Sequence, residues 1–301
     1  MLWYMCGLLK MNNILLDYFT KENDRLFLDY FSHNEHIPTW KRDLYKLQKN
    51  LLPKLQELEN KLSIIIQGPL NTRSLKTIPH YLRYGEVVVS CWDTDNQDTL
   101  KPYLDKIKLV VNKYKDVNRY PSRPGSQAPW IFQHHTTLNG LKEAKGTLAI
   151  KVRSDESFPI LDPIIRKMRQ NRDTINPETG TCNWHKIVTS NIYFRYDREK
   201  KFHPSDHIIG GNRKRMISVF ERAERLCKSK LEIPFPEQLL CKCVLETYRD
   251  SFNYSKSKEL MKKHFDIIRI RDLPNHIWTS SYRKYDALYS EEDWCHDINK
   301  I

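Results

Sequence analysis

The sequence has neither a long apolar run nor a glycine-rich segment. None of its apolar stretches approaches the ~18 residues that a membrane-spanning helix needs, and the N-terminal run 1–9 is interrupted by Lys10. The chain has only 9 glycines in 301 residues, and no glycine-rich loop precedes the first helix of the predicted sheet. These absences disfavour a membrane anchor, a secretory signal and a nucleotidyltransferase with a phosphate-binding loop.

Cysteines also lack the pattern of a disulfide-stapled protein. The chain has 7 of them, an odd number without framework spacing, which is typical of a reduced compartment such as the cytosol. Cys241 and Cys243 are two residues apart on a predicted helix, so they point in different directions and are predicted to pack rather than share a metal. The sequence therefore predicts a cytosolic protein, with action near an anionic membrane left open.

A formal net charge of +13 predicts attraction to polyanions. The candidates are nucleic acid, an anionic membrane surface and phosphorylated small molecules. A nucleic-acid-binding protein or a metal-dependent nuclease should show a basic stripe with interleaved aromatics or a known fold signature. The basic region 195–230 instead has acidic neighbours between its cations, as ordinary solvated helices do. Nucleic acid is therefore the less favoured partner.

Apolar periodicity predicts an α/β protein with an N-terminal helical extension, residues 1–62. Leucines from Leu44 to Leu62 recur every three or four residues and form one helical stripe. From Ser63, predicted strands at 63–66, 86–91, 108–111 and 147–153 alternate with helices. Such alternation predicts a mostly parallel sheet flanked by helices, with ligands beyond the carboxyl ends of the strands.

The stretch Ala149–Glu156 is the most informative, because an apolar strand ends there in two carboxylates. Asp155 and Glu156 are suitable ligands for a hard divalent cation, which a diphosphate would complete. Lys151 and Arg153 alternate along the same strand, so both are expected to face that diphosphate. The alternative is a solvated strand end with an internal salt bridge.

Short motifs over roughly residues 63–245 resemble those of the WavE-like glycosyltransferases. This family is associated with lipopolysaccharide synthesis and has bacterial and large-DNA-virus members. The residues that carry the resemblance, in chain order, are Ile65-Ile66-Gln67-Gly68-Pro69 with Thr72, Val89-Ser90-Cys91-Trp92-Asp93, Asn118-Arg119 ahead of Gly140-Leu141, Lys151-Val152-Arg153-Ser154-Asp155, Ser205-Asp206 ahead of Gly210, and Pro236-Glu237-Gln238.

The resemblance implies a GT-A fold over residues 63–301, with a nucleotide-sugar-binding half (63–156) and an acceptor-binding half (157–301). It implies a UDP-sugar donor, a glycan or glycoconjugate acceptor, and Mn²⁺ or Mg²⁺ bound at a D-x-D-like motif. Here that motif departs from the pattern and is Ser154-Asp155-Glu156. Asp155 is the implied metal ligand, a role for Glu156 stays open, and His276 or His264 is a candidate late ligand, against the alternative of a structural histidine.

Further roles follow from the same resemblance. Residues implied to contact the nucleotide or the diphosphate are Gln67, Gly68, Asp93, Asp95, Asn118, Arg119, Lys151 and Arg153. An inverting enzyme needs a carboxylate base, for which Asp206 and Glu237 are the candidates. Ordinary turn chemistry is the alternative for the loop residues, and a favourable helix-terminal charge is the alternative for Glu237. A catalytically inactive sugar-binding protein is the remaining reading.

Overall fold

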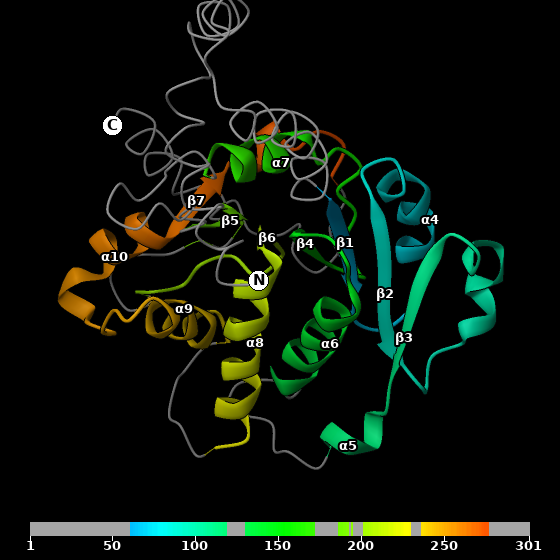
Figure 1. Ribbon diagram of the computed structural model, residues 1–301, viewed down its shortest axis with the longest axis horizontal. Coiled ribbons are helices and arrows are strands. Elements are labelled where there is room, and N and C mark those ends of the chain that lie inside the picture. The colour runs from blue at the N-terminus through cyan, green and yellow to red at the C-terminus, as the bar shows by residue number, and fades with distance from the viewer. Residues whose placement is uncertain are drawn as a thin grey trace, which may run out of the picture. The chain divides into compact units, whose positions relative to one another are not determined.

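A computed structural model describes residues 61–118, 130–171, 186–192, 194, 201–229 and 236–276. The predicted helical extension lies outside the described residues except for its last two, which lead into the first strand. Arg119 also lies outside them. The described chain contains a seven-stranded sheet with helices packed against it (Figure 1).

The sheet has the strand order β3-β2-β1-β4-β6-β5-β7. All neighbouring pairs are parallel except those of β6, which runs antiparallel to both β4 and β5. The strands are β1 (Leu62–Gln67), β2 (Glu86–Trp92), β3 (Ile107–Asn112), β4 (Leu148–Arg153), β5 (Ile187–Ser190), β6 (Ile208–Asn212) and β7 (Phe265–Ile268). The predicted α/β class with a mostly parallel sheet is confirmed.

The central strands β1, β2 and β4 are mostly apolar and are buried along nearly their whole length, because both faces of the sheet are covered. The helices are α4 (Thr72–Tyr81), α5 (Tyr114–Asn118), α6 (Trp130–Glu143), α7 (Asp162–Gln170), α8 (Arg213–Cys227), α9 (Pro236–Thr247) and α10 (Ser257–His264). Short 3-10 helices, η1 (Gln97–Tyr103), η3 (Tyr254–Lys256) and η4 (Ile270–Asp272), complete the set. Figure 1 shows α6, α8 and α9 together below the sheet and α4 and α7 above it.

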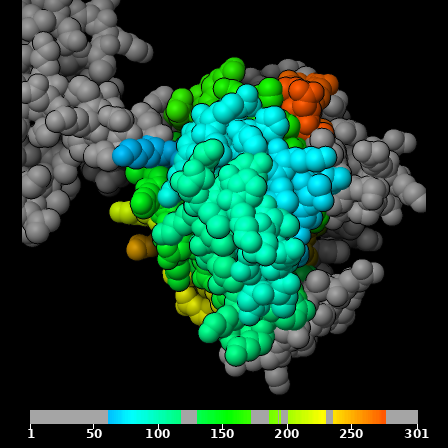
Figure 2. Space-filling model, turned by 90° about the vertical axis from the view of Figure 1, so that its right-hand side faces the viewer, coloured from blue at the N-terminus to red at the C-terminus, as the bar shows by residue number. Residues whose placement is uncertain are grey.

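Two adjacent glycines of β6 show how closely these layers pack. A Cβ on Gly210 would lie 2.5 Å from Met168 Sδ of α7, whereas one on Gly211 would lie 3.3 Å from Ile187 and 3.7 Å from Met216 of α8. Successive residues of a strand point to opposite faces, so α7 and α8 cover opposite faces of β6. The far edge of the sheet is formed by β3, and Figure 2 faces the surface made by residues from α4 to β3, coloured cyan to blue-green.

Candidate active site

The loops after β1 and β4 lie side by side at the carboxyl edge of the sheet. Gln67 is paired in register with Arg153, and the Ser154 N–H donates to Gln67 O at 2.9 Å. Gly68 has φ of +114°, and a Cβ there would lie 2.8 Å from Ser154 Oγ. Only glycine fits this position without strain. The structure thus brings Gln67 and Gly68 after β1 close to the Ser154-Asp155 turn after β4.

The start of α4 holds the turn 154–155 in place. Asn71 caps the helix by accepting hydrogen bonds from the Arg73 and Ser74 N–H groups at 2.8 and 3.0 Å. Its Nδ2 group donates to Ser154 O at 3.0 Å, and Arg73 Nη1 donates to Asp155 O at 2.7 Å. The backbone of this turn is therefore tied to the neighbouring loop. Asn71 and Arg73 were not among the predicted site residues, although Asn before a helix is a recognisable cap.

Asp155 and Arg153 form a two-pronged ion pair. Arg153 Nε donates to Asp155 Oδ1 at 2.9 Å and Nη2 donates to Oδ2 at 2.8 Å. The side chains are 35% and 23% exposed. Burial opposes ionisation of Asp155, but the hydrogen bonds and charge of Arg153 outweigh it and lower the pKa of this carboxyl group. The internal salt bridge that the sequence left as an alternative is present.

Glu156 points into the protein, unlike Asp155. Its side chain is 1% exposed, and Oε1 lies 2.5 Å from His207 Nδ1, while Oε2 has no hydrogen-bond partner in the described structure. His276 belongs to the same neighbourhood: its ring stacks on Phe158 with centroids 5.7 Å apart. Burial lowers the pKa of His276 to about 4, against the charge of Glu156. This geometry differs from the expectation that Glu156 and Asp155 face one cation. His264, the other candidate, instead contacts Asp250.

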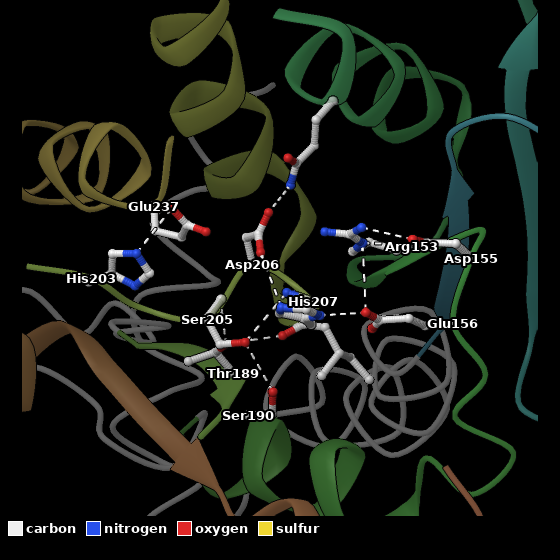
Figure 3. A network of polar contacts seen from close by, with 12 residues as sticks. Arg153, Asp155, Glu156, Thr189, Ser190, His203, Ser205, Asp206, His207 and Glu237 are labelled. Carbon is white, nitrogen blue, oxygen red and sulfur yellow. Dashed lines mark hydrogen bonds and ion pairs between the residues drawn. The ribbon is translucent and has the colours of Figure 1, made fainter. Parts of the chain in front are cut away.

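Lys151 and Asp206 form the buried centre of the cluster, and Figure 3 shows Asp206 with its neighbours. Lys151 is fully buried and its Nζ donates to the backbone oxygen of Asp206. Gln133 Nε2 donates to Asp206 Oδ2, and Oδ1 lies 3.9 Å from His207 Nε2. Burial raises the pKa of Asp206, but the charges of Lys151, His207 and Arg153 outweigh it and lower that pKa.

Burial also acts on Lys151, lowering its pKa to about 8, although the charge of Asp206 opposes this shift. Lys151 was expected to face a diphosphate beside Arg153. In the structure it lies in the interior, because it pairs with Ile65 in the middle of the sheet on the face that α6 covers, while Arg153 lies at the end of β4. Two partners in this cluster, Gln133 and His207, were missed. Only the adjacency of His207 to Asp206 in the sequence could have indicated one of them.

The remaining nucleotide candidates form hydrogen bonds with other residues of the protein. Gln67 Oε1 accepts a hydrogen bond from Thr136 Oγ1 at 2.8 Å, which ties β1 to α6. Asp93 Oδ1 accepts from the Tyr114 N–H at 2.9 Å and Asp95 Oδ2 from the Trp92 N–H at 2.8 Å. Of these contacts, only that of Asp95 lies within a turn and matches the turn chemistry that was the alternative reading. Asn118 ends α5, and its side chain is not described.

Glu237 lies in the first turn of α9, where its Oε2 is 3.2 Å from His203 Nε2. The segment that leads from His203 to Asp206 is anchored on β5, because Thr189 Oγ1 donates to Ser205 O at 2.6 Å and Ser190 Oγ lies 3.1 Å from Ser205 Oγ. In Figure 3, Asp206 lies between the Glu237–His203 pair and the Arg153–Asp155 pair. Both candidate bases therefore belong to one polar region.

Over the described residues, no group of three or more His, Cys, Asp or Glu side chains is placed to hold a metal ion. The described helices include none with the length and apolarity to cross a membrane. Cys241 and Cys243 are buried in α9 and unbridged, as predicted.

Solved structures with similar folds include glycosyltransferases. GlyE from Streptococcus pneumoniae matches at 11% identity and a TM-score of 0.41, over 80% of this chain and 62% of that one. An active-site mutant of LgtC matches at 9% identity and a TM-score of 0.41, over 61% of this chain and 70% of that one. TarS from S. aureus matches at 13% identity and a TM-score of 0.36, over 67% and 70%.

Because these scores are low, family assignment rests on the sequence. No curated protein matches the chain in sequence. Residues 62–257, most of the chain and the whole predicted range of resemblance, match the family described as WavE lipopolysaccharide synthesis. The chain belongs to the WavE lipopolysaccharide synthesis family.

Proposed function

We propose that this protein is a metal-dependent glycosyltransferase that moves a sugar from a nucleotide-diphosphate donor, a UDP-sugar, to a hydroxyl of a glycan or glycoconjugate. Glycosyltransferase activity follows from the family. The metal, the donor base and the acceptor are the proposed parts. The observation that supports the metal and the diphosphate is the edge formed by Gly68, Arg153 and Asp155, where a glycine adjoins an ionised carboxylate and a guanidinium group. The donor base and the acceptor are proposed from the resemblance alone.

The residues present suit a divalent cation. Asp155 is ionised, about a third exposed and located at the carboxyl end of β4. Mg²⁺ and Mn²⁺ need only one or two protein carboxylates when the oxygens of a diphosphate complete the shell. When bound, the ion would stabilise the negative charge that develops on the departing nucleotide. Glu156 and His276, behind Asp155 with His207, would support the site rather than supply its first ligand.

Binding of the donor involves the other edge residues. We assign Arg153 to the diphosphate, because a guanidinium group binds phosphate oxygens in a two-pronged manner. Gly68 would permit close approach of the nucleotide to the loop after β1. Asp93, Asp95, Asn118 and Arg119 stay proposed contacts to the base, the ribose or the diphosphate, and Gln67 would act through its bond to α6.

For an inverting reaction, the proposed base is Asp206 and the second candidate is Glu237. The acceptor oxygen would attack the anomeric carbon, the bond from that carbon to the diphosphate would break, and the acceptor proton would pass to the carboxylate. Asp206 has one oxygen held by Gln133 and the other, Oδ1, without a hydrogen-bond partner in the described structure. Its lowered pKa keeps it ionised. Glu237 is the more exposed of the two, at 18% for its side chain.

Thermal unfolding with nucleoside diphosphates, each with and without Mn²⁺, tests the proposal. Ligand at ~100 times its dissociation constant should add about 2.7 kcal/mol to stability. We expect a Mn²⁺-dependent shift with UDP that Asp155→Asn abolishes. Asp98→Asn, which changes an exposed aspartate of η1, is the matched control and should keep the shift.

A shift that requires Mn²⁺ and Asp155 would justify an assay of sugar transfer from UDP-sugars. A shift with another base would replace only the assignment of uridine. Absence of a shift with every nucleoside diphosphate would reject the transferase proposal in favour of a role that needs no nucleotide.

A further inference from the structure

Asp155 is already occupied by a cation of the protein itself. Both of its carboxylate oxygens accept hydrogen bonds from Arg153, at 2.9 and 2.8 Å. A divalent ion bound at these oxygens would lie against the guanidinium group, so the two cations compete for one carboxylate. The residue assigned to the diphosphate is thus the residue that blocks the assigned metal ligand.

We propose, on the basis of the function proposed above, that metal and diphosphate bind by a single exchange of partners. Arg153 leaves Asp155 for the phosphate oxygens, and the metal takes the carboxylate that Arg153 has left. Neither ligand then binds well alone. The metal alone would take from Arg153 its two-pronged partner, and the diphosphate alone would leave the Asp155 carboxylate without its cation.

The structure separates the part that must move from the part that must stay. The turn backbone is held by Asn71 at Ser154 O, by Arg73 at Asp155 O and by Gln67 O at the Ser154 N–H. The side chains of Arg153 and Asp155, in contrast, are 23% and 35% exposed. The exchange therefore needs only rotation of two side chains above a fixed turn.

The surroundings also prevent Arg153 from being isolated during the exchange. Glu156 Oε1 lies 3.7 Å from Arg153 Nε and is 1% exposed. The charge of Asp206 acts on Arg153 as well. These buried carboxylates keep the guanidinium group at the sheet edge after it leaves Asp155, so that it stays within the region assigned to the diphosphate. Phosphate suits this group, because its oxygens match the two-pronged geometry that the carboxylate provided.

The exchange of partners by Arg153 and Asp155 predicts a thermodynamic coupling between Mn²⁺ and UDP that two merely adjacent binding sites would not show. If UDP strengthens Mn²⁺ binding by some factor, Mn²⁺ must strengthen UDP binding by the same factor. We expect that factor to be about tenfold or more in the wild-type protein, which is within the usual range for coupled sites. Arg153→Gln removes the blocking charge, so Mn²⁺ alone should bind this variant more tightly than it binds the wild type. UDP should bind the variant more weakly, and the coupling should fall.

The experiment is titration of Mn²⁺ followed by the EPR signal of the free ion, with and without UDP, and calorimetric titration of UDP with and without Mn²⁺. It uses the full chain as wild type, Arg153→Gln, Arg153→Lys and Asp155→Asn. Lys76→Gln, which removes an exposed cation from α4, controls for the change in net charge. Arg153→Lys keeps the charge but loses the two-pronged contact, and we expect it to fall between the wild type and Arg153→Gln.

The outcomes distinguish the exchange from the function on which it rests. The exchange is supported if Mn²⁺ alone binds Arg153→Gln more tightly than it binds the wild type and Lys76→Gln, and if the coupling between Mn²⁺ and UDP is smaller in Arg153→Gln. If UDP binding depends on Mn²⁺ but Mn²⁺ binds the wild type and Arg153→Gln with the same affinity, the exchange is wrong and the proposed function is still supported. Failure of UDP and of every other nucleoside diphosphate to bind under any condition overturns both.

Discussion

Two regions of this protein meet at β4 and use charged residues in opposite ways. The edge region consists of Gly68, Asn71 and the 154–155 turn. Its polar side chains mostly bond to backbone groups, and the Arg153–Asp155 pair stays partly exposed. The buried cluster consists of Lys151, Glu156, Asp206 and His207. Each of these residues is at most 5% exposed. Local backbone geometry determines the first region, whereas balance among enclosed charges determines the second. Substitutions should accordingly cost little stability at the edge and much in the cluster.

Loss of Lys151 should have the largest effect. Lys151→Met keeps most of the volume but leaves the enclosed Asp206 carboxylate without its main counter-charge. Removal of one partner of a buried ion pair costs about 3–5 kcal/mol, and we expect a loss of free energy of unfolding of this size in urea denaturation. Lys142→Met is the matched control, since Lys142 forms an exposed pair with Glu221 at 3.0 Å and should cost at most about 1 kcal/mol.

A second substitution sharpens this result. Asp206→Asn in the Lys151→Met background removes the stranded charge, so part of the lost stability should return. Equal losses for Lys151→Met and Lys142→Met would show that the cluster is no more sensitive than the surface, and the contrast between the two regions would be wrong.

The sequence predicted the residues of both regions better than it predicted their surroundings. Strand alternation correctly placed Lys151 and Arg153 on β4. Gln67 and Gly68 after β1 and the Ser154-Asp155 turn after β4 also share one edge of the sheet. Alternation is a local property, however, and it cannot show that β6 runs antiparallel beside β4 and encloses Lys151. The contacts of Asp206 with Gln133 and of His207 with Glu156 join residues 73 and 51 positions apart. Such pairs depend on how the layers pack, which no short motif specifies.

At the edge, Gly68→Ala should have the largest effect on stability. The substitution forces an alanine to adopt φ of +114° and places its Cβ 2.8 Å from Ser154 Oγ, and we expect a cost of about 2 kcal/mol in urea denaturation. Adding Ser154→Ala removes the close contact but not the strain in the backbone, so recovery should be partial. The control is Gly211→Ala, whose new Cβ would meet only the ends of flexible side chains at 3.3 Å or more. A larger loss at Gly211 than at Gly68 would reject the role assigned to the turn.

His134, a buried neutral neighbour of the cluster, should respond to pH. Neither ring nitrogen has a hydrogen-bond partner in the described structure, and burial lowers its pKa from 6.5 to about 4. Between these values the unfolded chain binds a proton that the folded protein does not, so stability is lost as pH falls from 6.5 to 4. His134→Phe should remove about 1–2 kcal/mol of the loss measured between pH 7 and pH 5.

Denaturation of His134→Phe in urea at these two pH values checks the prediction. His80→Gln, at an exposed position of α4, is the control and should leave the pH dependence unchanged. An unchanged pH dependence in His134→Phe would mean that His134 is protonated or solvated inside the folded protein, and that the interior near Asp206 is less dry than the structure indicates.

The smallest effect expected is that of Asn71, which has two separable contacts. Its Oδ1 caps α4 and its Nδ2 group donates to Ser154 O. Asn71→Ala removes both and should cost about 1 kcal/mol. Asn71→Ser keeps an oxygen for the cap and loses the Nδ2 donor without adding charge, so it should retain most of the stability. Asn96→Ala is the control, because Asn96 caps η1 through a 3.2 Å contact to the Asp98 N–H.

Binding of UDP with Mn²⁺ then separates the two contacts. If the 154–155 turn must stay fixed while Arg153 and Asp155 exchange partners, Asn71→Ser should weaken UDP binding more than Asn96→Ala does, although it is the more stable protein. Calorimetric titration of both variants measures this difference. Equal UDP affinities would show that Arg73 and the Ser154 N–H suffice to hold the turn. The edge would then resemble the buried cluster more closely, as a structure kept in place by several redundant partners.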